Sequence, residues 1–413
     1  MNSEPQSIAD YREAARKHLP RFVFDFIDGG SGSENTLQEN REALDRIRLL
    51  GSAPANVSEC SQAVRLFGHE YKMPVIIGPT GLAGAAWPRG DLDLARAAAA
   101  QAIPFVMSSA ATVRMEDVAA AGAGSKWFQL YVFKDREVSK RLALKAHDLG
   151  FTALEVTVDN AIPGRRLRDA RNGFSLPFRW TPGKLASLLA HPSWTLQMAR
   201  NGAPGLEVMA AELGLEPTET IAELMQSLLD PSVEWETIKW LRDLWKGPLI
   251  VKGMLDPGQV KHALKIGIDG LVISNHGGRQ LDGAIASIDI LPEFRKAAGE
   301  DLTLFIDSGF RTGSDIARAL ALGADAVQVG RATLYALASG GERSVRNALA
   351  VLKEELKVVQ ILMGARTVAD LNPAMLRRHA PPAQMLAPVA GGPAPEAHAV
   401  LSLVTGGAPN PAP

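Results

Sequence analysis

The feature that most constrains this fold is an alternation of short apolar runs with amphipathic segments, repeated eight times. The runs that read as strands are 74–80, 104–109, 127–132, 153–159, 248–253, 270–275, 303–309 and 326–330. Helix-like segments such as 91–102, 136–150 and 313–324 lie between them. Eight such units indicate parallel strands that close into a (β/α)8 barrel, an α/β fold of the TIM type. A doubly wound open sheet is the alternative, but no GxGxxG motif follows the first strand.

Three segments lie outside the predicted barrel. Residues 1–70 predict a helical lead-in, and residues 175–232 form an insertion between the fourth and fifth strands. Residues 364–413 form a C-terminal extension rich in Pro, Ala and Gly, which predicts disorder at its end. We expect residues 1–363, with the insertion, to form a single domain.

Charge and cysteine content exclude several classes of protein. The formal net charge is −1, which does not favour a nucleic-acid-binding surface. The single cysteine excludes an internal disulfide and suits a reducing compartment. The polar N-terminus lacks a signal peptide, and no apolar stretch approaches the ~18 residues of a membrane span. We expect a cytoplasmic protein, soluble or peripheral to a membrane.

Polar residues collect where the predicted strands end, which is where (β/α)8 barrels place their active sites. These residues are Gln129, Tyr131, Thr157, Asp159, Lys252, Ser274, His276 and Asp307, with Gly330 and Arg331 after the eighth strand. A single one of them is more often an ordinary rim group. A polar residue or glycine at every strand end indicates a functional site.

The last two strand ends predict a phosphate site. The stretches "DSGFRTGSD" and "VGRATLY" each place glycine and arginine before a helix. Glycine allows close backbone approach to a phosphate, and helix N-terminal amides and arginine donate hydrogen bonds to it. Turn glycines with surface arginines explain either motif alone, whereas the two together favour a phosphorylated cofactor.

The stretch "SNHGGRQLD" places His276 and Arg279 directly after the sixth strand. A histidine near a carboxylate such as Asp159 is a general base, and arginine binds a carboxylate with two hydrogen bonds. Lys252 fits either a Schiff base or the binding of an anionic group. Together with Tyr131, these residues favour proton abstraction next to a carboxylate, with the cofactor taking the electrons.

The motifs "SNHGGRQLD", "GRRLRDARNGF", "FQLYV", "VKG" and "DSGFRTGSDIARALALGA" resemble the FMN-dependent 2-hydroxy acid dehydrogenases and oxidases. The resemblance covers residues 7–365 and implies oxidation of an (S)-2-hydroxy acid to the 2-oxo acid. It also implies a homotetramer. Within the family, "GPTGLAGAAWPRGDLDLARAA" and "WETIKWLRDLW" are similar to the mandelate-oxidising members.

The resemblance implies a role for each matching residue. His276 is the base and Asp159 supports its imidazolium, while Tyr131 hydrogen-bonds near the substrate oxygen. Arg279 and Arg166 bind the substrate carboxylate, and Lys252 lies beside N1 and O2 of the flavin. The residues expected at the isoalloxazine and ribityl groups are Pro79, Thr80, Gly81, Ser108, Gln129, Thr157 and Ser274. Those expected at the ribityl and phosphate groups are Asp307, Gly309, Arg311, Gly330 and Arg331. No metal site is expected.

Three departures from the family pattern concern the substrate pocket. Phe26 stands where the family usually has a tyrosine that helps to bind the carboxylate. Ala110 stands where the short-chain oxidases carry a bulky aromatic side chain, and Gly81 where many oxidases have alanine. Together they predict a pocket for (S)-mandelate or another large 2-hydroxy acid.

The insertion bears on the electron acceptor. Residues 177–216 mix aromatic and aliphatic side chains with basic ones, a composition that suits a bilayer interface. The resemblance implies docking on the cytoplasmic face of the inner membrane, with a quinone as acceptor. A loop that covers the barrel mouth is the alternative reading of the insertion.

Three other functions remain open from the sequence. One is an oxidase of the same family, of hydroxymandelate, lactate or glycolate type, which uses O2 and makes hydrogen peroxide. Another is a lyase that uses Lys252 as a Schiff base without flavin. The third is a catalytically inactive barrel, which the intact set of His276, Asp159, Lys252 and Arg279 disfavours.

Overall fold

The structure is a computed structural model that describes residues 4–173, 181–214 and 228–378. The chain divides into two units, Met1–His379 and Ala380–Pro413, and everything below concerns the first. The predicted disorder of the C-terminal end lies outside the described residues.

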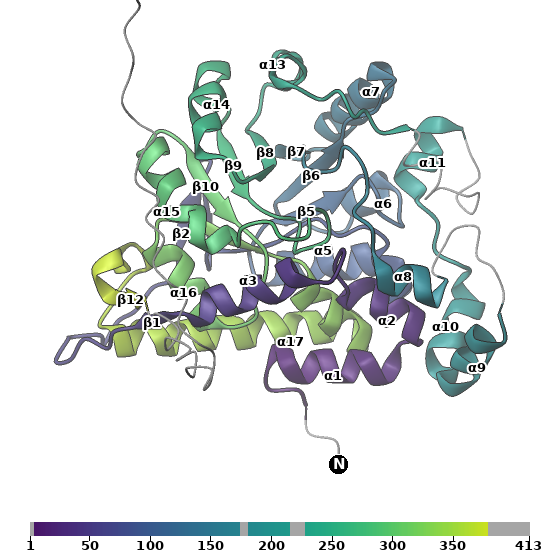
Figure 1. Cartoon of the computed structure of the whole chain (residues 1–413), viewed down its shortest axis with the longest axis horizontal. Helices are drawn as coiled ribbons and strands as arrows, with labels where there is room; N and C mark the ends of the chain where they lie inside the picture. The colour runs from purple at the N-terminus through teal and green to yellow at the C-terminus, as the bar shows by residue number, and fades with distance from the viewer. Residues whose placement is uncertain (1–3, 174–180, 215–227, 379–413) are drawn as a thin grey trace, which may run out of the picture. The chain divides into compact units, whose positions relative to one another are not determined.

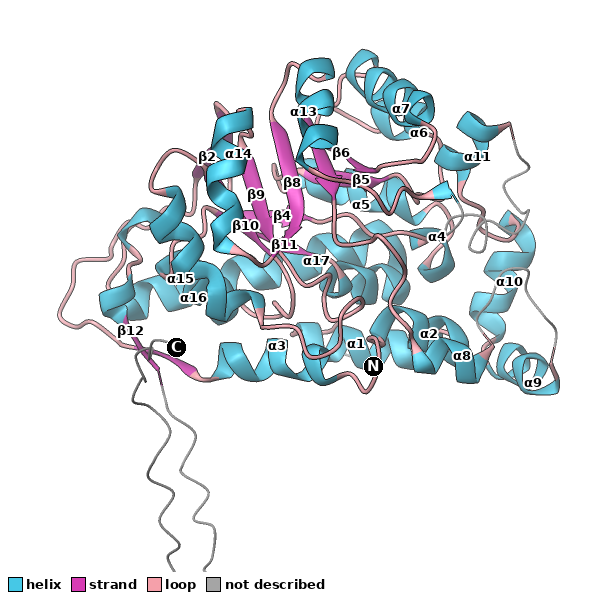
Figure 2. Ribbon diagram, turned by 45° about the horizontal axis from the view of Figure 1, so that its top comes forward, coloured by secondary structure: helices cyan, strands magenta, loops and turns pink. Residues whose placement is uncertain are grey.

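Eight parallel strands form a closed barrel, as the sequence predicts (Figures 1 and 2). They are β4 (Val75–Ile77), β5 (Phe105–Ser108), β6 (Lys126–Tyr131), β7 (Ala153–Thr157), β8 (Leu249–Met254), β9 (Gly270–Ile273), β10 (Thr303–Ile306) and β11 (Ala326–Val329). The barrel closes where β11 pairs with β4, with Val327 opposite Val75. The predicted TIM-type fold is therefore confirmed.

Helices surround the strands (Figure 2). Those between or after the barrel strands are α4 (Ala83–Ala86), α5 (Gly90–Ala100), α6 (Met115–Ala119), α7 (Arg136–Asp148), α8 (Leu167–Asn172), α13 (Trp235–Leu244), η1 (Pro257–Gln259), α14 (Val260–Ile266), α15 (Ser287–Ala298), α16 (Gly313–Ala321) and α17 (Arg331–Met363). The lead-in forms α1 (Ile8–His18), α2 (Arg21–Asp28) and α3 (Asn35–Asp45). A hairpin of β2 (Val64–Leu66) and β3 (His69–Tyr71) follows.

The barrel interior has two layers. Successive side chains of a strand point to opposite faces, so residues two apart face the same way. The lower layer is apolar and consists of Ile76, Val106, Trp127, Ala153, Ile250, Val272, Phe305 and Ala326. Two residues further along each strand, the upper layer consists of Gly78, Ser108, Gln129, Glu155, Lys252, Ser274, Asp307 and Gln328. An apolar plug therefore supports a polar floor at the carboxyl ends of the strands.

Asp28, at the end of α2, links the lead-in to α8 and α17 of the barrel. Its carboxylate accepts hydrogen bonds from Arg12 Nε at 2.6 Å, Arg168 Nη1 at 2.9 Å and Tyr335 Oη at 2.8 Å. Burial opposes the charge of Asp28, but these donors outweigh burial and lower its pKa to about 2. Helices α1 and α17 run side by side (Figure 1).

Residues 364–378, which we assigned to the C-terminal extension, contain η2 (Val368–Asp370), η3 (Pro373–Met375) and β12 (Leu376–Arg378). Strand β12 pairs antiparallel with β1 (Ile47–Leu49), so the compact unit includes these residues.

The described part of the insertion contains α9 (Pro182–Ala190), α10 (Pro192–Asn201) and α11 (Glu207–Leu213). Trp194 anchors it, because Nε1 donates to the Ala85 carbonyl at 2.9 Å and the indole meets the Phe22 ring edge-on. Helices α9 and α10 lie at the edge of the unit beside α2 and α8 (Figures 1 and 2). In the described ranges no helix is both long and apolar enough to cross a bilayer.

Candidate active site

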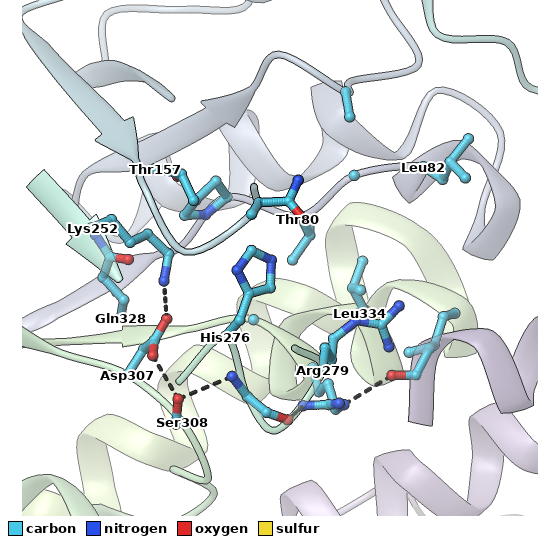
Figure 3. Close-up of a pocket in the computed structure, with 18 of the residues that line it drawn as sticks. Thr80, Leu82, Thr157, Lys252, His276, Arg279, Asp307, Ser308, Gln328 and Leu334 are labelled. Atoms are coloured by element: carbon cyan, nitrogen blue, oxygen red, sulfur yellow. Dashed lines mark hydrogen bonds and ion pairs between the residues drawn. The ribbon is translucent and has the colours of Figure 1, made fainter. Parts of the chain in front are cut away.

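A cavity of about 360 Å³ opens above the polar floor. The sequence-predicted residues that line it are Phe26, Pro79, Thr80, Gly81, Ala110, Tyr131, Thr157, Arg166, Lys252, His276, Arg279, Asp307, Gly309, Arg311, Gly330 and Arg331. Lys252, Gln328 and Asp307 lie to one side of the His276 imidazole, and Arg279 lies to the other (Figure 3). The structure thus brings most of the predicted site into one space.

The imidazole of His276 is held by Asp159, with 2.9 Å between Nδ1 and Oδ1. Nε2 makes no hydrogen bond within the described residues, so it is the nitrogen available to a molecule in the cavity. Asp159 does not line the cavity, and its Oδ2 is buried without a hydrogen-bond partner. A carboxylate behind an imidazole stabilises the protonated ring, which is the arrangement of a general base.

The backbone of the "HGG" motif explains its composition. His276 has φ +57°, a left-handed conformation that costs energy for a residue with a side chain. Gly277 and Gly278 continue at φ +65° and +71°, and a Cβ on Gly278 would lie 2.6 Å from the backbone nitrogen of Leu37. The two glycines therefore let the chain reverse under α3 while the imidazole points into the cavity.

Arg166 and Arg279 lie at the other side of the cavity, where Asp169 also lines it. Arg279 Nη1 donates to the carbonyls of Phe26 at 2.7 Å and Gly29 at 3.0 Å, and its guanidinium lies over the Phe26 ring. Within the described residues Arg279 has no ion pair, whereas Arg166 Nη1 lies 3.9 Å from Asp169 Oδ2. Arg166 Nε is buried without a hydrogen bond. Burial, then the charges of Arg166 and Arg331, holds the pKa of Arg279 well below its usual value. The buried, unpaired charge of Arg279 indicates an anion-binding site.

Tyr131 lines the same cavity as the His276 imidazole and the arginines. Burial, then the charge of Asp159, raises its pKa to about 12. The phenol therefore stays protonated at neutral pH and is a hydrogen-bond donor toward the cavity.

Lys252 supplies a fixed positive charge at the floor. Its Nζ donates to Ser274 Oγ at 2.9 Å and forms an ion pair with Asp307. Burial disfavours both charges, but their attraction outweighs it, so the pKa of Lys252 is raised and that of Asp307 is lowered. A lysine held in the charged form does not act as a Schiff-base nucleophile, which requires the neutral amine.

Three predicted cofactor residues lie in the floor rather than on the cavity surface. Ser108 Oγ donates to Gln129 Oε1 at 3.0 Å, and Gln129 Nε2 donates to Thr157 Oγ1 at 2.9 Å. Ser274 Oγ accepts from Lys252 and from the backbone nitrogen of His276. Ser108, Gln129 and Ser274 therefore position the residues that line the cavity.

The predicted phosphate end combines a helix N-terminus with arginines. Gly330 is the N-cap of α17, whose first helical stretch ends at the break at Gly340 and Gly341. Arg311 lies over the Tyr335 ring without an ion pair in the described residues. Arg331 also lines the cavity and donates to the carbonyls of Ile27, Gly29 and Gly277, which ties the end of α2 to the loop after β9. The backbone amides of the helix N-terminus and the positive charge of Arg311 favour anion binding at this end of the cavity.

Several lining residues were not anticipated from the sequence. Part of the cavity wall is apolar and is formed by Leu82, Leu206, Leu229 and Leu334. Leu206 and Leu229 come from the insertion. Gln328 also lines the cavity, and its only sequence signal is a polar residue inside an apolar strand. Among the described residues, no group of His, Cys, Asp and Glu is arranged to hold a metal ion.

Known proteins resemble this chain over nearly the whole described unit. The sequence model of a family described as FMN-dependent dehydrogenase matches residues 15–378. L-lactate dehydrogenase of Yersinia pestis (strain Pestoides F) is 44% identical over 365 residues, covering 88% of this chain and 96% of that protein. The crystal structure of monotopic membrane protein (S)-mandelate dehydrogenase has TM-score 0.88 and 40% identity, covering 91% of this chain and all of the other. A mandelate oxidase mutant with (S)-mandelic acid has TM-score 0.76 and 33% identity, covering 90% and 98%.

Proposed function

This chain belongs to the FMN-dependent dehydrogenase family, and we propose that it oxidises (S)-2-hydroxy acids with a large, aryl side chain to 2-oxo acids. One observation carries the proposal. The Asp159–His276 pair lines or borders the same cavity as two arginines. Arg279 has no ion pair in the described residues, and Arg166, which pairs with Asp169 at 3.9 Å, keeps Nε without a hydrogen bond. A general base and carboxylate-binding arginines at one site suit proton removal from a molecule that carries a carboxylate.

The residues of the cavity fit the cofactor of this family, FMN. The N-terminus of α17 and Arg311 provide an anion site for its phosphate, and Lys252 provides a positive charge at the polar floor. The cavity volume lies within the ~300–1,000 Å³ range of small-molecule sites. Bound FMN supplies the chemistry of electron acceptance.

The protein's own residues then have separate tasks. Arg279 and Arg166 hold the substrate carboxylate, which fixes the reacting carbon relative to His276. Tyr131 donates to the substrate oxygen. His276 Nε2 takes a proton from the substrate, and Asp159 stabilises the resulting imidazolium. Lys252 keeps its charge at the polar floor, where it would stabilise negative charge on FMN.

The pocket wall supports a large substrate. Ala110 leaves open the space that a bulky side chain would fill, and a Cβ added to Gly81 would lie 3.0 Å from the Ala110 Cβ. Leu82, Leu206 and Leu229 supply apolar surface for a substituent. Lactate is the second candidate, because L-lactate dehydrogenase is among the most similar proteins found.

Substrate preference tests the pocket. We expect native kcat/KM to be higher for (S)-mandelate than for (S)-lactate or glycolate. The Ala110→Leu variant fills the space and should lower the mandelate-to-lactate ratio of kcat/KM about tenfold or more, because a few methylenes are worth ~1–3 kcal/mol in such pockets.

The matched control is Ala120→Leu, the same change at an exposed position outside the cavity, which should leave the ratio unchanged. A native preference for lactate would refute the aryl pocket and favour the second candidate.

We propose a quinone as electron acceptor, with the insertion docked on the cytoplasmic face of the inner membrane. Leu185, Leu189 and Leu196 on α9 and α10 are 53%, 75% and 50% exposed, whereas Trp194 is buried. The solved (S)-mandelate dehydrogenase is described as a monotopic membrane protein. Hydrogen peroxide formed as fast as substrate is consumed would instead indicate an oxidase. The family resemblance also favours a homotetramer, which analytical ultracentrifugation tests.

Cell fractionation tests the docking. The triple change Leu185→Ser, Leu189→Ser and Leu196→Ser should move most of the protein from the membrane to the supernatant, since each buried leucine contributes ~1.5–3 kcal/mol. Leu144→Ser, on the exposed face of α7, should leave the distribution unchanged. Equal distributions of the native and triple-variant proteins would exclude this docking surface.

A further inference from the structure

The polar floor contains a buried pair that the proposed mechanism does not use. Glu155 on β7 is 0% exposed, and Gln328 on β11 is 2% exposed. Gln328 Nε2 donates to Glu155 Oε2 at 2.5 Å across the inside of the barrel. Gln328 lines the cavity and Glu155 does not, so the amide stands between the carboxyl group and whatever fills the cavity.

Few groups compensate the charge of Glu155. Within the described residues, Glu155 Oε1 and Gln328 Oε1 are buried without hydrogen-bond partners. The charged groups that act on Glu155 are Lys252 from β8, which favours its ionisation, and Asp307 from β10 and Asp159 from the end of β7, which oppose it. Burial is the largest influence and raises the pKa of Glu155 to about 7. Its protonation state is therefore open to change near neutral pH.

The counter-charge of Glu155 is shared with the cofactor site. Lys252 is paired with Asp307 and lines the cavity, so any negative charge that develops above it competes with Glu155 for the same ammonium group. A nearby negative charge disfavours a second one. Glutamine suits the intervening position, because its amide can donate to a carboxylate or accept from a carboxylic acid after a flip.

We propose that Glu155 and Gln328 form a proton-linked pair that follows the redox state of FMN. Glu155 is ionised while FMN is oxidised and takes up a proton from water when FMN is reduced. On reduction FMN gains two electrons and one proton, and Glu155 gains a second proton as one O–H bond forms. Glu155 acts through Lys252 and Gln328 and is a positioning residue. This inference rests on the FMN binding of the proposed function but not on its substrate.

The test is the midpoint potential of bound FMN against pH, measured by spectroelectrochemistry on the holoenzyme without substrate. One extra proton in a two-electron couple steepens the dependence by about 30 mV per pH unit. The native protein should show this extra slope above pH 7, and Glu155→Gln, which keeps the shape but cannot titrate, should lack it. A native protein without the extra slope, or a Glu155→Gln variant that retains it, would overturn the proposal.

Two further variants make the result specific. Asp91→Asn removes another buried carboxyl group of raised pKa, one that is bonded to Thr112 and does not line the cavity, and it should keep the native slope. Gln328→Leu removes the donor to Glu155 and should move the onset of the steep region to higher pH, which also tests the pair if Glu155→Gln fails to bind FMN. An unchanged onset in Gln328→Leu counts against the pair. Because reduction is electrochemical, a wrong substrate assignment leaves these outcomes unaffected.

Discussion

The His276→Gln variant is expected to bind FMN normally and to be reduced by (S)-mandelate about 10³-fold more slowly than the native protein. Glutamine retains a hydrogen-bonding group but accepts no proton, and a positioned general base contributes typically ~10²–10⁴-fold. The measurement is the loss of flavin absorbance after anaerobic mixing with substrate. Asp159→Asn should slow the same step by a smaller factor, because it weakens support of the imidazolium and leaves the ring in place.

A matched control is available on the outside of the barrel. His262 stacks on Trp235 and does not line the cavity. In the His262→Gln variant, (S)-mandelate should therefore reduce the bound FMN at the native rate. If FMN in the His276→Gln variant were reduced at a rate within a fewfold of the native rate, another group would have to take the proton.

The Arg279→Met variant should lower kcat/KM for (S)-mandelate about 10³-fold. Removing one partner of a buried charge pair costs ~2–5 kcal/mol, and every ~1.4 kcal/mol is a factor of ten. The loss should be much smaller with mandelamide, in which an uncharged amide replaces the carboxylate. The kcat/KM of Arg279→Lys for (S)-mandelate should fall between those of the native protein and Arg279→Met, since lysine keeps the charge but not the bidentate geometry.

The control for this variant is Arg65→Met, which removes an exposed guanidinium on β2, outside the cavity, and should leave kcat/KM unchanged. Equal losses for mandelate and mandelamide would mean that Arg279 supports the fold of the loop through Phe26 and Gly29 rather than the substrate.

The barrel and most lining residues were predictable because their signals are local. Each strand is a short apolar run with its polar residue at or just past the end, and His276 and Arg279 lie three residues apart in one glycine-rich loop. Closure into a barrel follows from the number of parallel strands. Helix α15, which contains Pro292, was not among the segments named from the sequence, since proline is unfavourable inside a helix.

The rest could not be predicted because it depends on contacts between distant parts of the chain. The Glu155–Gln328 bond joins residues 173 positions apart, and neither residue alone distinguishes a paired polar group from a strand-end rim residue. The motif of Arg331 predicts a phosphate ligand but gives no sign of its hydrogen bonds to three carbonyls, two of them in the lead-in. Leu206 and Leu229 reach the cavity only because the insertion folds back over it.

The proposed function is tested most directly by a crystal structure of the oxidised His276→Gln holoenzyme soaked with (S)-mandelate. We predict that the carboxylate accepts hydrogen bonds from Arg279 and Arg166, that the hydroxyl lies at Tyr131, and that the side chain at position 276 faces the reacting carbon. A carboxylate bound away from both arginines, or a reacting carbon turned away from position 276, would contradict the claim that one acid is held and deprotonated here.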